Sequence, residues 1–178
     1  MESVHILEFG TYLAGPLVGR YLSDFGCKVT CITRPAHSRG ACEEQRRMQQ
    51  MVPELRRGKT MVEIDLLQDL HLAQRLVQTS TVIVENFKPG TMDKLGLGFE
   101  ACKVLNPNIL YVSLPGFASE DEHFQNVTAY ESIILAAAGI FCDMGLNRQL
   151  LGIPASFSPL PLASVYGSIY ATFTTMTA

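Results

Sequence analysis

The fold is decided by residues 4–33, VHILEFGTYLAGPLVGRYLSDFGCKVTCIT. An apolar run at 4–9 is followed by a glycine-containing loop, a stretch with apolar residues at helical spacing, and an alternating run at 28–33. Pro16 stands where the first turn of a helix tolerates a residue without an N–H, and Gly26 suits the end of that helix. A strand, a helix and a second strand in about thirty residues predict a βαβ unit, which pairs its strands in parallel.

The rest of the chain extends this sheet. Short apolar or alternating runs at 60–66, 81–85 and 109–114 predict three more strands, with helical periodicity between them. Two further helices are expected over 128–141 and from 160 to the C-terminus. Strands that alternate with helices indicate an α/β fold, here an open, mostly parallel, Rossmann-like sheet with helices on both faces.

Composition narrows the classes of protein. The 178 residues are 47% apolar and carry 14 Lys and Arg against 17 Asp and Glu, which suits one domain over residues 1–178 and excludes global disorder. A pI near 5.8 argues against a nucleic-acid partner. The five Cys form no C-x-x-C pair and the four His have no metal-ligand spacing, so we expect free thiols in a reducing, cytoplasmic setting and no metal site.

The C-terminal stretch, residues 149–178, contains no Lys, Arg, Asp or Glu and is long enough to span a bilayer. Pro154, Pro159, Pro161 and many Ser and Thr residues favour instead a helix that is buried by its neighbours, so no membrane partner is expected. This helix has no cap and no charged last turn. We therefore interpret the chain as a piece of a longer protein, or as one whose core is completed by another subunit.

Three segments have features of a ligand site. The loop at 10–16 joins a strand to a helix but matches neither the dinucleotide fingerprint nor the P-loop, so a tight structural turn is an open alternative. Asn86 and Phe87 follow a buried strand, where open α/β sheets bind ligands, although an Asn-stabilised turn over a core Phe would give the same pattern. A basic connection suits a small polyanion or is a solvated loop; its basic residues are Arg34, Arg39, Arg46, Arg47, Arg56, Arg57 and Lys59.

Taken in order, these segments resemble the family III CoA-transferases, which include formyl-CoA transferase, carnitine CoA-transferase and acyl-CoA racemases. The resemblance covers nearly the whole chain, as the N-terminal part of a longer protein. It rests on residues 6–35, on RRGKTMVEIDL at 56–66 and, most specifically, on VIVENFKPGTMDKLGLGFEACKVLNPNILYVSLPGF at 82–117. Members of the family form interlocked homodimers, so the resemblance implies a homodimer or a tandem copy of this domain.

The resemblance also implies a ligand and a set of residues that hold it. Coenzyme A or its acyl thioester would be a substrate rather than a tightly bound cofactor, and a small carboxylic acid would be the second partner. Arg34 would approach the phosphates or the adenine, Lys59 would approach the phosphates, and Leu55 would form an apolar wall. The full set of matching positions is Leu13, Ala14, Gly15, Arg34, Leu55, Lys59, Asn86, Phe87 and Lys94.

One departure from the family concerns the catalytic carboxylate. Relatives carry an Asp in a segment like P-L-A-D, but here Ala163 or Ser164 takes its place. In the family this carboxylate attacks the thioester, forms a mixed anhydride and becomes an enzyme-bound CoA thioester, which neither Ala nor Ser can do.

Glu131 is the remaining carboxylate candidate, since it follows Tyr130 at the start of an apolar helix. It could be a positioning residue or a general base, or only a charge at a helix start. Two alternatives to a CoA-transferase therefore stay open: a catalytically degenerate CoA-binding or dimerisation domain, and an acyl-CoA racemase or lyase that uses Tyr130 and Glu131.

Overall fold

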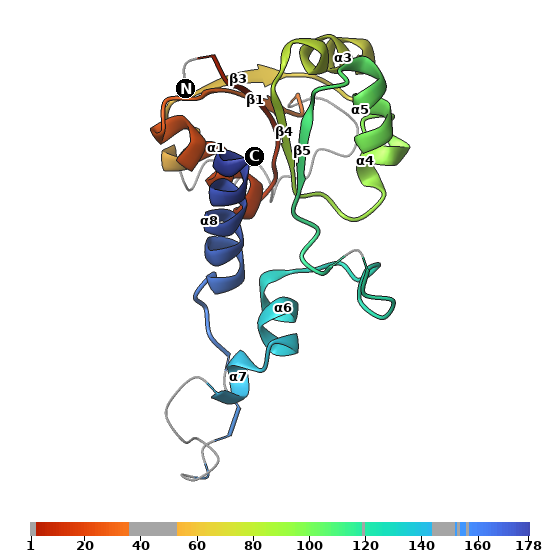
Figure 1. The fold of residues 1–178 in the computed structure, drawn as a ribbon. Coiled ribbons are helices and arrows are strands. Elements are labelled where there is room, and N and C mark those ends of the chain that lie inside the picture. The colour runs from red at the N-terminus through yellow and green to blue at the C-terminus, as the bar shows by residue number, and fades with distance from the viewer. Residues whose placement is uncertain (1–2, 36–52, 119, 144–151, 153, 156) are drawn as a thin grey trace.

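Figure 1 shows the computed structural model, which describes residues 3–35, 53–118, 120–143, 152, 154–155 and 157–178. The strands are β1 (His5–Phe9), β2 (Lys28–Thr33), β3 (Lys59–Glu63), β4 (Val82–Glu85) and β5 (Leu110–Ser113). They form one sheet in the order β3-β2-β1-β4-β5, and all neighbouring strands are parallel. The open parallel sheet that the sequence predicts is confirmed.

Helices cover both faces of the sheet (Figure 1). One face carries α1 (Ala14–Asp24) and α8 (Leu162–Thr177), and a short 3-10 helix, η1 (Pro53–Arg56), precedes β3. The other face carries α3 (Leu70–Thr79), α4 (Thr91–Lys94) and α5 (Phe99–Leu105).

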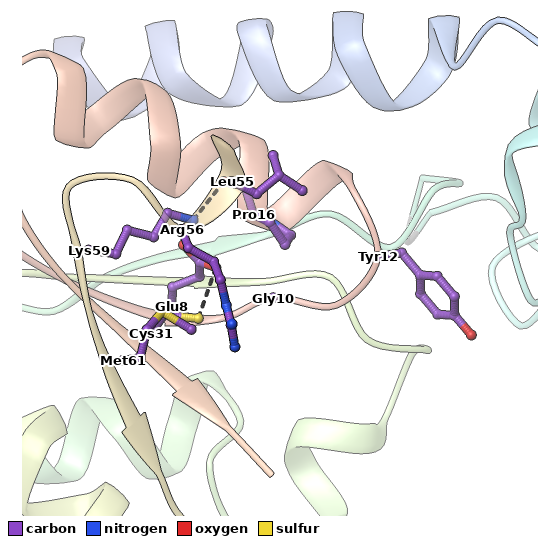
Figure 2. Close-up of a pocket in the computed structure, with 9 residues that line it drawn as sticks. All are labelled: Glu8, Gly10, Tyr12, Pro16, Cys31, Leu55, Arg56, Lys59 and Met61. Carbon is purple, nitrogen blue, oxygen red and sulfur yellow. Dashed lines mark hydrogen bonds and ion pairs between the residues drawn. The ribbon is translucent and has the colours of Figure 1, made fainter. Parts of the chain in front are cut away.

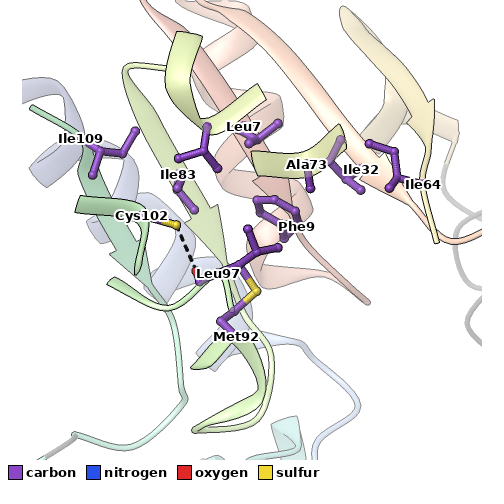
Figure 3. Close-up of a cluster of buried hydrophobic side chains, with 11 residues drawn as sticks. Leu7, Phe9, Ile32, Ile64, Ala73, Ile83, Met92, Leu97, Cys102 and Ile109 are labelled. Atoms are coloured by element: carbon purple, nitrogen blue, oxygen red, sulfur yellow. Dashed lines mark hydrogen bonds between the residues drawn. The ribbon is translucent and has the colours of Figure 1, made fainter. Parts of the chain in front are cut away.

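Each face has its own hydrophobic core because successive side chains of a strand point to opposite sides. Leu7 and Phe9 of β1 belong to the core against α3, α4 and α5, which Figure 3 shows. Ile6 belongs to the core against α1 and α8. Burying a side chain of this size contributes about 1.5–3 kcal/mol. β1 lies at the centre of the sheet and is buried on both faces from Ile6 to Phe9, which is why these residues are apolar except for Glu8.

The structure differs from the expected elements at two places. The helix expected over 128–141 is divided into α6 (Glu131–Ala137) and α7 (Ile140–Asp143), because Gly139 between them has a φ of +74°. β3 ends at Glu63 rather than at residue 66, and the chain then turns where the Asp65 side chain accepts a hydrogen bond from the N–H of Leu67 at 3.0 Å.

The connection after β5 leads away from the sheet to α6 and α7, and the chain returns to the sheet as α8 (Figure 1). The stretch weighed above as a membrane span contains α8, which has 16 residues. Within the described ranges, no helix combines the length and the apolar character that crossing a membrane requires.

Candidate functional site

The carboxyl edge of the sheet has a topological switch point between β1 and β4. The chain adds β2 and β3 on one side of β1 and then crosses to place β4 and β5 on the other side. The connections that leave β1 and β4 therefore diverge, and open α/β sheets bind ligands in the crevice at such a point. The diverging segments are residues 10–13 and 86–90. Topology thus brings together two of the three segments that the sequence singled out.

A pair of hydrogen bonds joins these two segments. The Asn86 side chain accepts from the N–H of Thr11 at 2.7 Å and donates to its carbonyl at 2.8 Å. A Cβ on Gly15 would lie 2.7 Å from the Asn86 side-chain oxygen, so this close approach requires glycine. Because both ends of the amide are engaged with Thr11, the Asn86 side chain fixes the loop. Both of these hydrogen bonds go to the loop after β1, 75 residues away, so Asn86 stabilises that loop rather than its own turn.

The loop after β1 leads directly into α1 and is strained. Tyr12 has a φ of 57°, and no other non-glycine residue in the described ranges has a positive φ. A left-handed backbone costs an L-residue about 1–2 kcal/mol, and such strain is often found at functional sites. At the start of α1 no capping side chain is present, and the N–H groups of Ala14 and Gly15 meet no hydrogen-bond acceptor among the described residues. The N–H groups of Ala14 and Gly15 belong to the segment at 10–16, for which the sequence predicts ligand binding.

A buried ion pair lies between the first turns of α1 and the sheet (Figure 2). The Lys59 ammonium lies 2.6 Å from a Glu8 carboxylate oxygen, and the two side chains are 1% and 0% exposed. Lys59 also donates to the carbonyl of Pro16 at 2.8 Å, and the Cys31 thiol donates to Glu8 at 3.2 Å. Gly19 of α1 makes room for the pair, because a Cβ there would overlap the Glu8 carboxylate. Lys59, expected at the phosphates, thus has its ammonium enclosed between α1 and the sheet.

The protonation of this cluster follows from its burial. Burial raises the pKa of Glu8, while the Lys59 ammonium and the hydrogen bonds from Lys59 and Cys31 act in the opposite direction. Burial, followed by the neighbouring Glu8 carboxylate, raises the pKa of Cys31 far above its usual range. Cys31 is therefore a neutral thiol and not a nucleophile at neutral pH.

A small cavity of about 20 Å³ opens beside the ion pair. This volume accommodates about one water molecule, so a larger ligand would lie at its mouth. Leu55, expected to form an apolar wall, is buried and lines this cavity. The other lining residues are Glu8, Gly10, Tyr12, Pro16, Cys31, Arg56, Lys59 and Met61.

The remaining predicted binding residues lie elsewhere. Phe87 packs against the core under α3, α4 and α5, on the opposite face of the sheet from Lys59. Arg34 is exposed directly after β2, and Lys94 is exposed at the end of α4; neither lines the cavity. The side chains of Arg34, Lys59 and Phe87 thus do not converge on one point as a joint grip on the phosphates would require. Three other basic residues of the connection lie outside the described residues: Arg39, Arg46 and Arg47.

Sequence reasoning missed Glu85, the last residue of β4. Its carboxylate accepts hydrogen bonds from the Ser113 hydroxyl and, at 2.9 Å, from the N–H of Phe87. It therefore ties the ends of β4 and β5 to the turn that carries Asn86. Burial raises the pKa of Glu85 despite these two donors. A usable signal was present for both Glu8 and Glu85, since each is a charged residue inside a predicted buried strand.

Glu131, the first residue of α6, contacts the start of α8, which is 32 to 33 residues later in the sequence. Its carboxylate accepts hydrogen bonds from the N–H of Ala163 at 2.7 Å, the N–H of Ser164 at 3.0 Å and the Ser164 hydroxyl at 2.5 Å. A carboxylate is favoured there by the free N–H groups and by the helix dipole. Ala163 and Ser164 are the two positions at which the family resemblance places the nucleophile. The structure thus puts the one remaining carboxylate candidate next to them.

Comparisons with known proteins identify the family to which this chain belongs. The model of the family "CoA-transferase family III" matches residues 1–178. The CoA-transferase/lyase DddD of Marinomonas sp. is 38% identical over 173 residues, 93% of this chain and 19% of that protein. The succinyl-CoA--D-citramalate CoA-transferase of Chloroflexus aurantiacus is 31% identical over 184 residues, 100% of this chain and 44% of that protein.

The same architecture occurs in a solved structure. The crystal structure of Rv3272 from Mycobacterium tuberculosis, orthorhombic form, matches with a TM-score of 0.83 and 27% identity, and covers 100% of this chain and 48% of that one. The chain therefore spans less than half the length of each of these three relatives.

Proposed function

Because the chain belongs to CoA-transferase family III, we propose that it is the CoA-binding part of an enzyme that transfers CoA between carboxylic acids. The observation that carries this proposal is the pair of hydrogen bonds between Thr11 and Asn86 at the switch point. These bonds hold the loop before α1 so that the N–H groups of Ala14 and Gly15 stay open to a ligand.

In this proposal the predicted residues have different roles. Leu13, Ala14 and Gly15 line the path of the CoA chain, and Leu55 supplies an apolar wall beside it. Lys59 acts indirectly, because its hydrogen bond to the Pro16 carbonyl holds the first turn of α1, which follows the loop. Arg34 is exposed directly after β2, and its proposed contact with the phosphates or the adenine rests on the sequence resemblance. For Phe87 and Lys94 the support is the sequence resemblance alone.

We assign Glu131 a positioning role at the acyl end of the site. Three hydrogen bonds hold its carboxylate on Ala163 and Ser164, which favours an anchor for α8 over a free nucleophile. The attacking carboxylate then comes from a second, non-identical copy of the domain that carries the Asp missing at Ala163 and Ser164. The chain matches 19% of the DddD relative and 44% of the citramalate enzyme, so a similar segment occurs in relatives of different length.

A second copy also fits the surface of α8. Its outer side exposes large apolar side chains, and a patch of this kind is typical of an interface. Their exposed fractions range from 49% to 72%: Tyr166, Ile169, Tyr170 and Phe173. We place the protein in the cytoplasm, where the described cysteines, all of them free thiols, stay reduced.

Two measurements on the full-length protein test this function. Calorimetry should show binding of CoA, and absence of binding would overturn the proposal. Incubation with succinyl-CoA, followed by hydroxylamine or borohydride trapping and peptide mass spectrometry, should modify a carboxylate outside residues 1–178. Modification of Glu131 would instead make it the nucleophile. Binding without any modified carboxylate would favour the catalytically degenerate CoA-binding domain, which the lack of a carboxylate at Ala163 and Ser164 supports.

A further inference from the structure

We propose that Arg56 is the cation that meets a phosphate group of the CoA thioester, an inference that rests on the function proposed above. The sequence counted Arg56 only as one member of a basic cluster. The structure separates it from the other described members by its position and by its lack of a partner.

The charge around the small cavity is unbalanced. Glu8 and Lys59 form a buried pair, so their opposite charges cancel. Arg56 also lines the cavity and is exposed, and its side chain makes no hydrogen bond or ion pair within the described part of the chain. The lining residues therefore carry one net positive charge, and it belongs to Arg56.

Its neighbour provides a natural contrast. Arg57 is exposed as well, but it lies 3.6 Å from Glu54 and 3.9 Å from Asp24 and does not line the cavity. Two adjacent arginines thus have different environments: Arg57 has acidic partners, and Arg56 has none among the residues that the structure describes.

The backbone of Arg56 is anchored next to the proposed binding loop. Leu55, its predecessor in η1, is buried. Arg56 lines the same cavity as Glu8 and Gly10, as Figure 2 shows, and its charge acts on the buried Cys31. A ligand phosphate at the mouth of the cavity would therefore meet the guanidinium on one side and the loop after β1 on the other.

The chemistry of the side chain favours phosphate. A guanidinium is always charged and offers a planar fork of donors that matches two phosphate oxygens. The cavity itself is too small for a phosphate, so the group lies outside it, where the exposed Arg56 can reach.

Calorimetry on the full-length protein tests this inference with CoA, dephospho-CoA and pantetheine as probes. Arg56→Ala should lower the affinity for CoA about tenfold and leave pantetheine binding unchanged. Arg57→Ala is the matched control and should bind CoA like the wild type. A loss for CoA alone assigns the 3′-phosphate, whereas a loss for CoA and dephospho-CoA assigns the pyrophosphate; either result supports the proposal.

The proposal is overturned if Arg56→Ala binds CoA like the wild type, if Arg57→Ala loses as much affinity, or if pantetheine binding falls by the same factor. Arg56→Lys keeps the charge but not the fork and should recover part of the affinity. Wild-type protein that binds no CoA would overturn the proposed function itself, so the two failures are distinguishable. Arg56 is exposed, and its variants should keep the wild-type unfolding midpoint.

Discussion

The beginnings of α1 and α8 treat the same chemical group in opposite ways. Both helices start with backbone N–H groups that have no partner within the helix. At α1 the N–H groups of Ala14 and Gly15 have no acceptor in the part of the chain that the structure describes, whereas at α8 those of Ala163 and Ser164 are held by Glu131. The first arrangement is prepared for a ligand, and the second is closed by the protein's own carboxylate.

The difference arises from what lies around each helix start. A neutral amide, Asn86, faces the loop before α1 and binds Thr11, so it orders the loop without occupying the helix start. A charged side chain faces α8 and binds the helix start itself. A loop that is ordered but unoccupied favours binding because little conformational freedom is lost when the ligand arrives.

The largest effect is expected from a change that disturbs the buried Glu8–Lys59 ion pair between α1 and the sheet. Gly19→Ala should lower the free energy of unfolding by about 3 kcal/mol, because the new methyl group displaces the Glu8 carboxylate from Lys59. Gly167→Ala in α8 is the matched control, since nothing lies within 4 Å of the position of its Cβ. It should be neutral or stabilising. Urea unfolding of both variants tests this, and equal stability would contradict it.

Removing the hydrogen bonds between Asn86 and Thr11 should affect both stability and CoA binding. Asn86→Ala leaves the N–H and the carbonyl of Thr11 without their partner, at a cost of about 1–3 kcal/mol. CoA affinity should fall as well, because the loop loses its fixed shape. Asn86→Asp keeps the acceptor for the Thr11 N–H and should retain more affinity than the alanine variant in calorimetry. Unchanged CoA affinity in Asn86→Ala would separate these hydrogen bonds from the binding site.

Weakening the hydrogen bonds between Glu131 and the start of α8 should have a smaller effect, and on stability alone. Glu131→Gln removes the charge that caps α8 and should cost about 1 kcal/mol. CoA affinity should not change, since the α8 start is occupied in the free protein. Denaturant unfolding and calorimetry on the same sample give both quantities. A large loss of CoA affinity would show that the two helix starts belong to one binding surface.

The smallest effect is expected on the pH dependence of stability, through Glu85 at the end of β4. Since burial raises the pKa of Glu85, the folded protein keeps this proton at pH values where the unfolded chain has released it. Its contribution to stability is therefore complete below the unfolded pKa of about 4.3 and is lost as pH rises through the folded value. Glu85→Gln should remove this part of the pH dependence. Urea midpoints measured from about pH 4 to pH 7 test the change in slope; an unaltered slope would contradict it.

The sequence by itself determined the sheet and its direction. The apolar run of β1, the helix-compatible Pro16, the stop at Gly26 and the strand with Lys28 are local signals, and local signals are sufficient for a βαβ unit. The order of motifs also identified the family over the whole chain. Periodicity failed at Gly139, where a single left-handed residue divides a helix that the apolar pattern continues.

Only the tertiary structure decided which polar groups meet. Lys59 and Glu8 are 51 residues apart, Asn86 and Thr11 are 75 apart, and Glu131 caps a helix that starts more than thirty residues later. Residue type alone could not show that the Lys59 side chain is enclosed while that of Arg56 is exposed. The physical reason is that burial belongs to the packed layers, and in a low-dielectric interior a charge must find its partner from whichever element the fold places beside it.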